Sequence, residues 1–152
     1  DMFAYKESTV AQIPVTEITN STLIKPQGRI FYAGNAASFS IDYCTMYGWG
    51  GSKAMLELGD KNTLGMSLAI KNTILANGGS NRKAHNANAA ANLSLTIEKV
   101  YGTNDMTFHS TLGDVTKYDK PSTEVFENPE EGNFKIIDAL FPSSIGDPRW
   151  TE

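Results

Sequence analysis

Cysteine and long apolar runs are nearly absent from this chain. The single cysteine, Cys44, has no partner for an internal disulfide. Small secreted domains often depend on disulfides, so a disulfide-stapled module is disfavoured. No segment approaches the roughly 20 apolar residues that a membrane-spanning helix needs, so we expect no membrane span. Asp1 is not an initiator residue, and any signal peptide is therefore not visible in this sequence.

Excess positive charge and known catalytic motifs are lacking too. Lys and Arg together number 13 against 17 Asp and Glu, and the pI is about 5.2. This balance argues against nucleic acid and anionic membranes as partners. Two histidines and one cysteine make no ligand cluster for a transition metal. Motifs of P-loops, zinc proteases and serine hydrolases are missing, so we expect no cofactor and no catalytic residues.

What the sequence does contain is two-residue alternation of apolar and polar side chains. In residues 38–47, Phe39 and Ile41 fall on one face of an extended strand, and Ser40 and Asp42 fall on the other. A helix is the alternative for residues 64–76, but strict alternation favours a strand there. Eight segments read as strands in this way: 9–19, 22–25, 29–33, 38–47, 52–58, 64–76, 92–101 and 106–112.

Short turns between these segments predict how the strands are joined. Glycine- and asparagine-rich turns at 48–51, 59–62 and 102–105 are typical of antiparallel hairpins. We therefore expect an all-β domain over residues 1–118, an antiparallel β-sandwich or jelly roll of about seven or eight strands with at most one short helix. Residues 119–152 hold four of the six prolines and more acidic than basic residues. They predict an irregular, proline-rich acidic C-terminal arm that packs on the same domain or on a neighbouring subunit.

Two segments are candidates for contact with a ligand or partner. Residues 77–92, NGGSNRKAHNANAAAN, form a long connection that contains the basic cluster Arg82, Lys83 and His85. This connection is either a plain surface loop or a loop that orders against a partner, and Ser80 is a candidate cap for a short helix within it. Trp49, in the turn YGWGG, either stacks on a sugar ring or anchors a partner, or else folds back over the domain.

The expected hairpin register makes one chemical forecast. It places Asp42 directly opposite Glu57 on the outer sheet face, with β-carbons about 5 Å apart. Paired carboxylates suit Ca²⁺, and retaining glycosidases hold their acids at this spacing. Asp42 and Glu57 are therefore weak candidates for a metal or hydrolase site, and a register shift of one residue removes the pair. The same logic places His109 opposite Glu98 as a surface pair.

Three functions follow from these features. The first is a non-enzymatic structural subunit of a virion, phage tail, pilus or other surface assembly, in which the loop of Arg82, Lys83 and His85 and the arm contact copies of itself or other protein subunits. The alternative is a carbohydrate-binding module that uses Trp49, and the third is a hydrolase that uses Asp42 and Glu57. The first two favour a location outside the cell, on a cell surface or on a virion.

Overall fold

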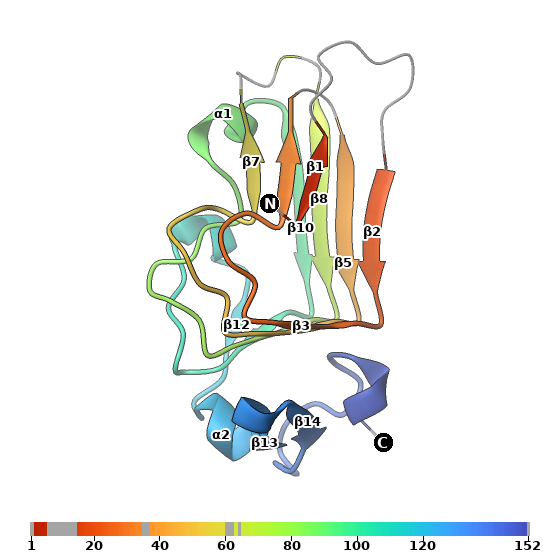
Figure 1. The fold of residues 1–152 in the computed structure, drawn as a ribbon, viewed down its shortest axis with the longest axis vertical. Helices are drawn as coiled ribbons and strands as arrows, with labels where there is room; N and C mark the ends of the chain where they lie inside the picture. The colour runs from red at the N-terminus through yellow and green to blue at the C-terminus, as the bar shows by residue number, and fades with distance from the viewer. Residues whose placement is uncertain (1, 6–14, 35–36, 60–62, 64, 152) are drawn as a thin grey trace.

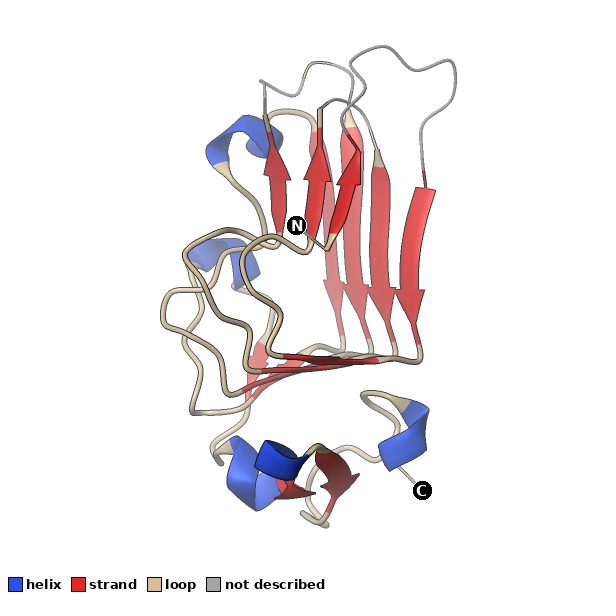
Figure 2. Ribbon diagram, viewed as in Figure 1, coloured by secondary structure: helices blue, strands red, loops and turns tan. Residues whose placement is uncertain are grey.

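The structure, a computed structural model, describes residues 2–5, 15–34, 37–59, 63 and 65–151. The chain winds into a β-solenoid of about three turns, whose walls are three parallel sheets (Figures 1 and 2). In spatial order, sheet A holds β1 (Phe3–Tyr5), β4 (Phe31–Ala33) and β7 (Leu56–Leu58); sheet B holds β10 (Leu93–Glu98), β8 (Met66–Lys71), β5 (Ser38–Asp42) and β2 (Val15–Thr19); sheet C holds β12 (Thr116–Lys117), β11 (Tyr101–Gly102), β9 (Ile74–Ala76), β6 (Thr45–Tyr47) and β3 (Thr22–Ile24).

All strand pairs in sheets A, B and C are parallel, so the predicted antiparallel sandwich or jelly roll is wrong. The all-β class is confirmed. Most predicted strands contain real ones, but several long segments bend from one sheet into the next. Residues 38–47, for example, are β5, a corner and β6, and residues 64–76 contain β8, a corner and β9. The predicted turn residues 60–62, Leu64 and residues 9–14 of the first predicted strand lie outside the described residues.

Two-residue corners between sheets B and C explain this difference. The first residue of each corner is left-handed: Asn20, Tyr43, Asn72 and Lys99 have φ of 48°, 49°, 42° and 52°. Asparagine tolerates this conformation better than most residues. The second residue points inward, as the fully buried Cys44 shows. The inward-facing positions shift by one residue at the corner, from Ile41 to Cys44 and Met46. No glycine or proline marks the bend, so two strands read as one in the sequence.

The solenoid interior is a stack of matching side chains from successive coils. Ile18, Ile41, Ile70 and Ile97 lie in register along sheet B. The rings of Phe31 and Phe39 stack with centroids 4.5 Å apart. Burying each such side chain contributes about 1.5–3 kcal/mol, so the ladders supply much of the stability of the solenoid.

Residues 77–92 belong to the solenoid and form the return path of its third coil. Leu56 pairs with His85, which adds one residue to sheet A beyond β7. The helix expected from Ser80 is shorter than predicted: α1 spans Ala87–Ala90, and the side chain of Asn86 caps it by accepting the N–H of Ala89 at 3.0 Å.

The C-terminal arm lies across the outer face of sheet C, below it in Figure 1. Its short elements are α2 (Ser122–Val125), β13 (Phe126–Asn128), the 3-10 helix η2 (Pro129–Glu131), β14 (Asn133–Ile136) and the 3-10 helix η3 (Pro148–Trp150). Phe126, Phe134 and Phe141 of the arm pack with Tyr47 and Ile74 of sheet C in a second apolar core. The arm thus rests on its own chain. Within the described ranges, no helix has the length and apolar character needed to cross a membrane.

Candidate functional site

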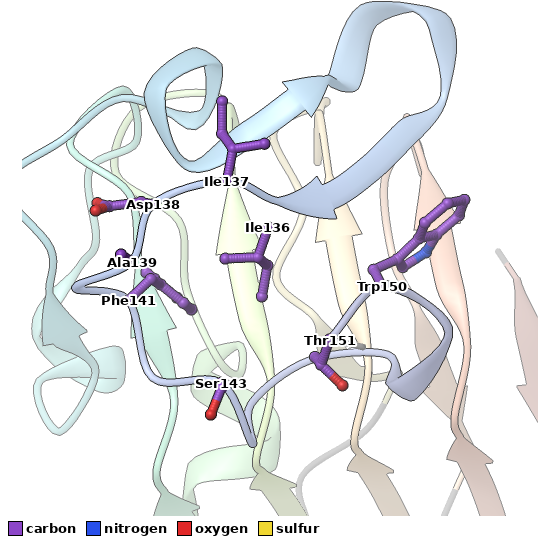
Figure 3. A pocket seen from close by; sticks show the side chains of 8 residues that line it. All are labelled: Ile136, Ile137, Asp138, Ala139, Phe141, Ser143, Trp150 and Thr151. Atoms are coloured by element: carbon purple, nitrogen blue, oxygen red, sulfur yellow. The ribbon is translucent and has the colours of Figure 1, made fainter.

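Two cavities of about 310 Å³ are the candidate sites, and the first lies in the C-terminal arm (Figure 3). Figure 3 shows the Asp138 carboxylate and the Trp150 indole turned away from the middle of this cavity. Asp138 is instead held by the Tyr118 hydroxyl at 2.7 Å, and the Trp150 indole N–H donates to Thr22 at 2.7 Å. Because its polar groups do not converge, we interpret the arm cavity as a gap between packed segments of the arm and not as a ligand site. Its lining residues are Ile136, Ile137, Asp138, Ala139, Phe141, Ser143, Trp150 and Thr151.

The second cavity, here called the histidine pocket, contains both histidines of the chain. Seven of its nine lining residues carry charged or hydrogen-bonding side chains, which can orient a ligand. The lining residues are Ser52, Ala54, Glu57, Lys83, His85, Asn86, Ala87, His109 and Thr111.

Three successive coils build the histidine pocket. The segment 54–57 leads into β7, the segment 83–86 lies beside it, and the segment 107–111 follows on the far side. The Met55 N–H donates to the Lys83 carbonyl at 2.9 Å, and the His109 N–H donates to the Arg82 carbonyl at 2.8 Å. Parallel stacking therefore brings together residues that lie 26–29 positions apart in the sequence.

The two histidines present their rings differently. Nδ1 of His85 lies 3.0 Å from the Asn86 carbonyl oxygen, which can only accept, so this nitrogen carries the proton. Nδ1 of His109 accepts the Thr111 N–H at 3.2 Å, so in the neutral ring the proton sits on Nε2. His85 therefore offers an Nε2 acceptor, and His109 offers an Nε2–H donor.

Charge in and around the pocket is positive on balance. Glu57, whose side chain is 13% exposed, lies 3.6 Å from Arg29 and 3.7 Å from Lys53, and it accepts the Ala54 N–H at 3.2 Å. Lys83 is exposed and, within the part of the chain that the structure describes, has no carboxylate within 4 Å. Arg29 and Lys53 thus pair with the one carboxylate of the lining, and Lys83 lies apart from them, in a chain whose net charge is −4.

Of the four predicted contact residues, only Lys83 and His85 line the pocket. Trp49 is fully buried, and its indole N–H donates to the Gly28 carbonyl at 3.2 Å. Arg82, 9% exposed, donates to carbonyls of Gly50, Gly51 and Ser80, and its guanidinium lies 5.7 Å from the Trp49 ring centre. The Trp49 turn therefore folds back over the domain, and Arg82 fastens the return loops together.

The predicted pair of Asp42 and Glu57 does not form, because the two acids lie on different sheets. Asp42 ends β5 in sheet B, pairs with Lys71 and accepts the Asn72 side-chain amide at 2.8 Å. Glu57 lies on β7 in sheet A. The described residues hold no group of three or more metal-ligating side chains.

His109 is the pocket residue whose place the sequence analysis missed. Its predicted partner, Glu98, instead lies 3.5 Å from Lys71 in sheet B. The signal that would have located His109 is the number of residues in each coil. Arg82 pairs with Phe108, which lies 26 positions later in the sequence and directly precedes His109. An irregular repeat of this length, had it been detected, would have placed His109 beside Lys83.

A family model described as a domain of unknown function, DUF5123, matches residues 39–150, about three quarters of the chain. The chain belongs to the DUF5123 family. The matched segment begins within β5 and includes the whole histidine pocket and nearly all of the arm, so both are parts of the DUF5123 domain. No curated protein and no solved structure matches the chain significantly.

Proposed function

We propose that this DUF5123 domain is a non-catalytic binding module and that its ligand is an anion held in the histidine pocket. The observation that carries the proposal is the convergence of two donors, Lys83 and His109, on one cavity, although they lie on different coils. Ion pairs with Arg29 and Lys53 offset the charge of Glu57, so an anion meets little repulsion there.

Binding is favoured over hydrolysis because the acid pair on which hydrolysis depended does not form. Asp42 belongs to another sheet, and Glu57 is engaged by Arg29, Lys53 and a backbone N–H. The buried position of Trp49 also removes the expected sugar-stacking residue of the lectin hypothesis. A positively charged pocket and a polar wall support a ligand recognised by charge and hydrogen bonds.

Calorimetric titration with sodium sulfate tests the proposal. Against the same ionic strength of sodium chloride, we expect saturable binding that Lys83→Gln weakens about tenfold, because a charge-assisted hydrogen bond is lost. Lys135→Gln is the matched control, since Lys135 is an exposed lysine of the arm strand β14. Equal affinities for both variants, or no sulfate binding, would contradict the proposal.

A second candidate is the assembly subunit, and exposed apolar side chains on the first strands of the solenoid favour it. The arm and the basic loop pack on their own chain, so they no longer motivate contacts with neighbours. However, among the described residues β1, β2 and β3 lie at one edge of their sheets, and Phe3, Val15 and Ile24 are 40%, 66% and 53% exposed. Edge strands with exposed apolar side chains favour pairing with another strand.

Light scattering during size-exclusion chromatography tests assembly through this edge. We expect a concentration-dependent dimer that Val15→Lys, a charge on the edge strand β2, disrupts. A monomer at all concentrations would remove this candidate. We propose other protein subunits and glycans as partners, and we do not propose nucleic acid. Both functions agree with the proposed location outside the cell, on a cell surface or on a virion.

A further inference from the structure

We infer that the ligand of the histidine pocket is an acidic saccharide, whose carboxylate or sulfate group contacts Lys83 and His109 and whose hydroxyl groups contact Glu57. This inference rests on the proposed function, because it names the class of anion that the pocket takes.

Donors and acceptors occupy opposite ends of the pocket. Glu57 belongs to the first of the three coils and His109 to the last, and neighbouring parallel strands lie about 4.8 Å apart. The two residues are therefore separated by about 10 Å along the solenoid axis. Lys83, on the middle coil, lies next to His109, since the His109 N–H donates to the carbonyl of residue 82 at 2.8 Å. A ligand that satisfies the whole pocket is anionic at one end and donates hydrogen bonds at the other.

Glu57 separates a saccharide from a simple inorganic anion. Its carboxylate already pairs with Arg29 and Lys53, but its further lone pairs can accept only from a group that donates, which sulfate and phosphate dianions do not. A sugar hydroxyl supplies the donor. Ser52 adds a hydroxyl to the same wall, and a cavity of about 310 Å³ accommodates one small unit of a longer chain.

Recognition in this pocket depends on charge rather than on ring stacking. Among the residues that the structure describes, no Phe, Tyr or Trp lines the histidine pocket. Aromatic stacking would be indifferent to the charge of the sugar, whereas contacts with Lys83 and His109 require an anion. A neutral derivative of the same sugar is therefore the sharpest comparison.

The test is calorimetric titration of the intact chain with digalacturonate, its dimethyl ester, a chondroitin sulfate disaccharide and inorganic sulfate. We expect at least one acidic disaccharide to bind tenfold or more tightly than sulfate, and the dimethyl ester to bind at least tenfold more weakly than digalacturonate. The carboxylated and sulfated probes distinguish the two sources of negative charge. Equal binding of the ester and the acid, or tighter binding of sulfate than of every disaccharide, overturns the inference.

Two variants keep this test separate from that of the proposed function. Glu57→Gln should weaken acidic-disaccharide binding at least threefold and leave sulfate binding unchanged or tighter, because it removes a negative acceptor. Lys83→Gln should weaken both ligands, and Lys135→Gln should weaken neither. Sulfate binding that depends on Lys83, with no disaccharide preference, supports the anion site and overturns the saccharide. If neither ligand binds, both proposals fail.

Discussion

At the scale of single residues, the backbone decides what each pocket histidine offers a ligand. Asn86 supplies a carbonyl to His85, and Thr111 supplies an N–H to His109, so the two rings are held as opposite tautomers. The chain has only two histidines, which makes their ring signals easy to assign.

Long-range ¹H–¹⁵N spectra of the imidazole rings test this arrangement. Above neutral pH, we expect the proton of His85 on Nδ1 and that of His109 on Nε2. His85→Ala and His109→Ala assign the two sets of signals. The same tautomer in both rings, or averaged signals from both, would show that the backbone contacts do not hold.

Trp49 shows how a residue can be misread from its neighbours. Four glycine and tyrosine neighbours in YGWGG suggest an exposed turn, yet the side chain is fully buried beneath the return loops. Exposure at a turn and folding back over the domain are both compatible with this composition, because burial here depends on contacts with Gly28 and Arg82 from other coils.

Truncating Trp49 should therefore affect stability. We expect Trp49→Ala to lower the free energy of unfolding by about 3–5 kcal/mol, as for other large buried side chains. Leu140→Ala, at a site 81% exposed, should change it by less than about 0.5 kcal/mol. Urea unfolding followed by circular dichroism measures both. A Trp49 variant as stable as the wild type would mean that the indole is not in the core.

At the scale of elements, strand positions were predictable and strand partners were not. Alternation located β5, β8 and β10 because more buried residues alternate with more exposed ones along each of them. Alternation carries no information on strand direction. The corners at Tyr43 and Asn72 shift its phase by one residue, with no glycine or proline to mark the bend. The hairpin register looked consistent because inward-facing residues match in a solenoid as well. The assumption of antiparallel hairpins is what paired Asp42 with Glu57.

Four carboxylates fasten the C-terminal arm to the solenoid. Hydrogen bonds from Tyr118 and Lys120 lower the pKa of Asp138, and one from Tyr47 lowers the pKa of Glu130. Burial raises the pKa of Asp147, but hydrogen bonds from Arg149 and Thr22 outweigh it, so the net pKa is lowered. Burial likewise opposes the hydrogen bonds from Ser122 that lower the pKa of Asp105.

The lowered pKa values predict the acid sensitivity of the arm. A carboxyl whose folded pKa lies below its unfolded value stabilises the fold above the unfolded pKa, and this contribution is lost as pH falls through the folded pKa. We therefore expect stability to fall on acidification below about pH 4. Asp147→Asn should cost about 1–3 kcal/mol at pH 7 and reduce the loss between pH 7 and pH 3.

Urea unfolding at pH 7 and pH 3 checks the expectation. Asp114→Asn is the control, since Asp114 is an exposed acid outside the arm. If the two variants behave alike, the buried Asp147 does not fasten the arm.

At the scale of the whole molecule, unequal coils concealed the solenoid. Corresponding residues in sheet B are 23 positions apart from β2 to β5, 29 from β5 to β8 and 27 from β8 to β10. With such offsets, and with different residues at equivalent sites, no fixed repeat is visible in the sequence. The histidine pocket inherits this difficulty, because its parts come from three coils and meet only when these coils stack in parallel.

The most direct test of the account is a crystal structure of the protein grown with digalacturonate. Stacked parallel coils, with ligand density in the histidine pocket and an anionic group within hydrogen-bond distance of Lys83 and His109, are the predicted result. Coils joined as antiparallel hairpins, or ligand bound elsewhere with this pocket empty, would contradict it.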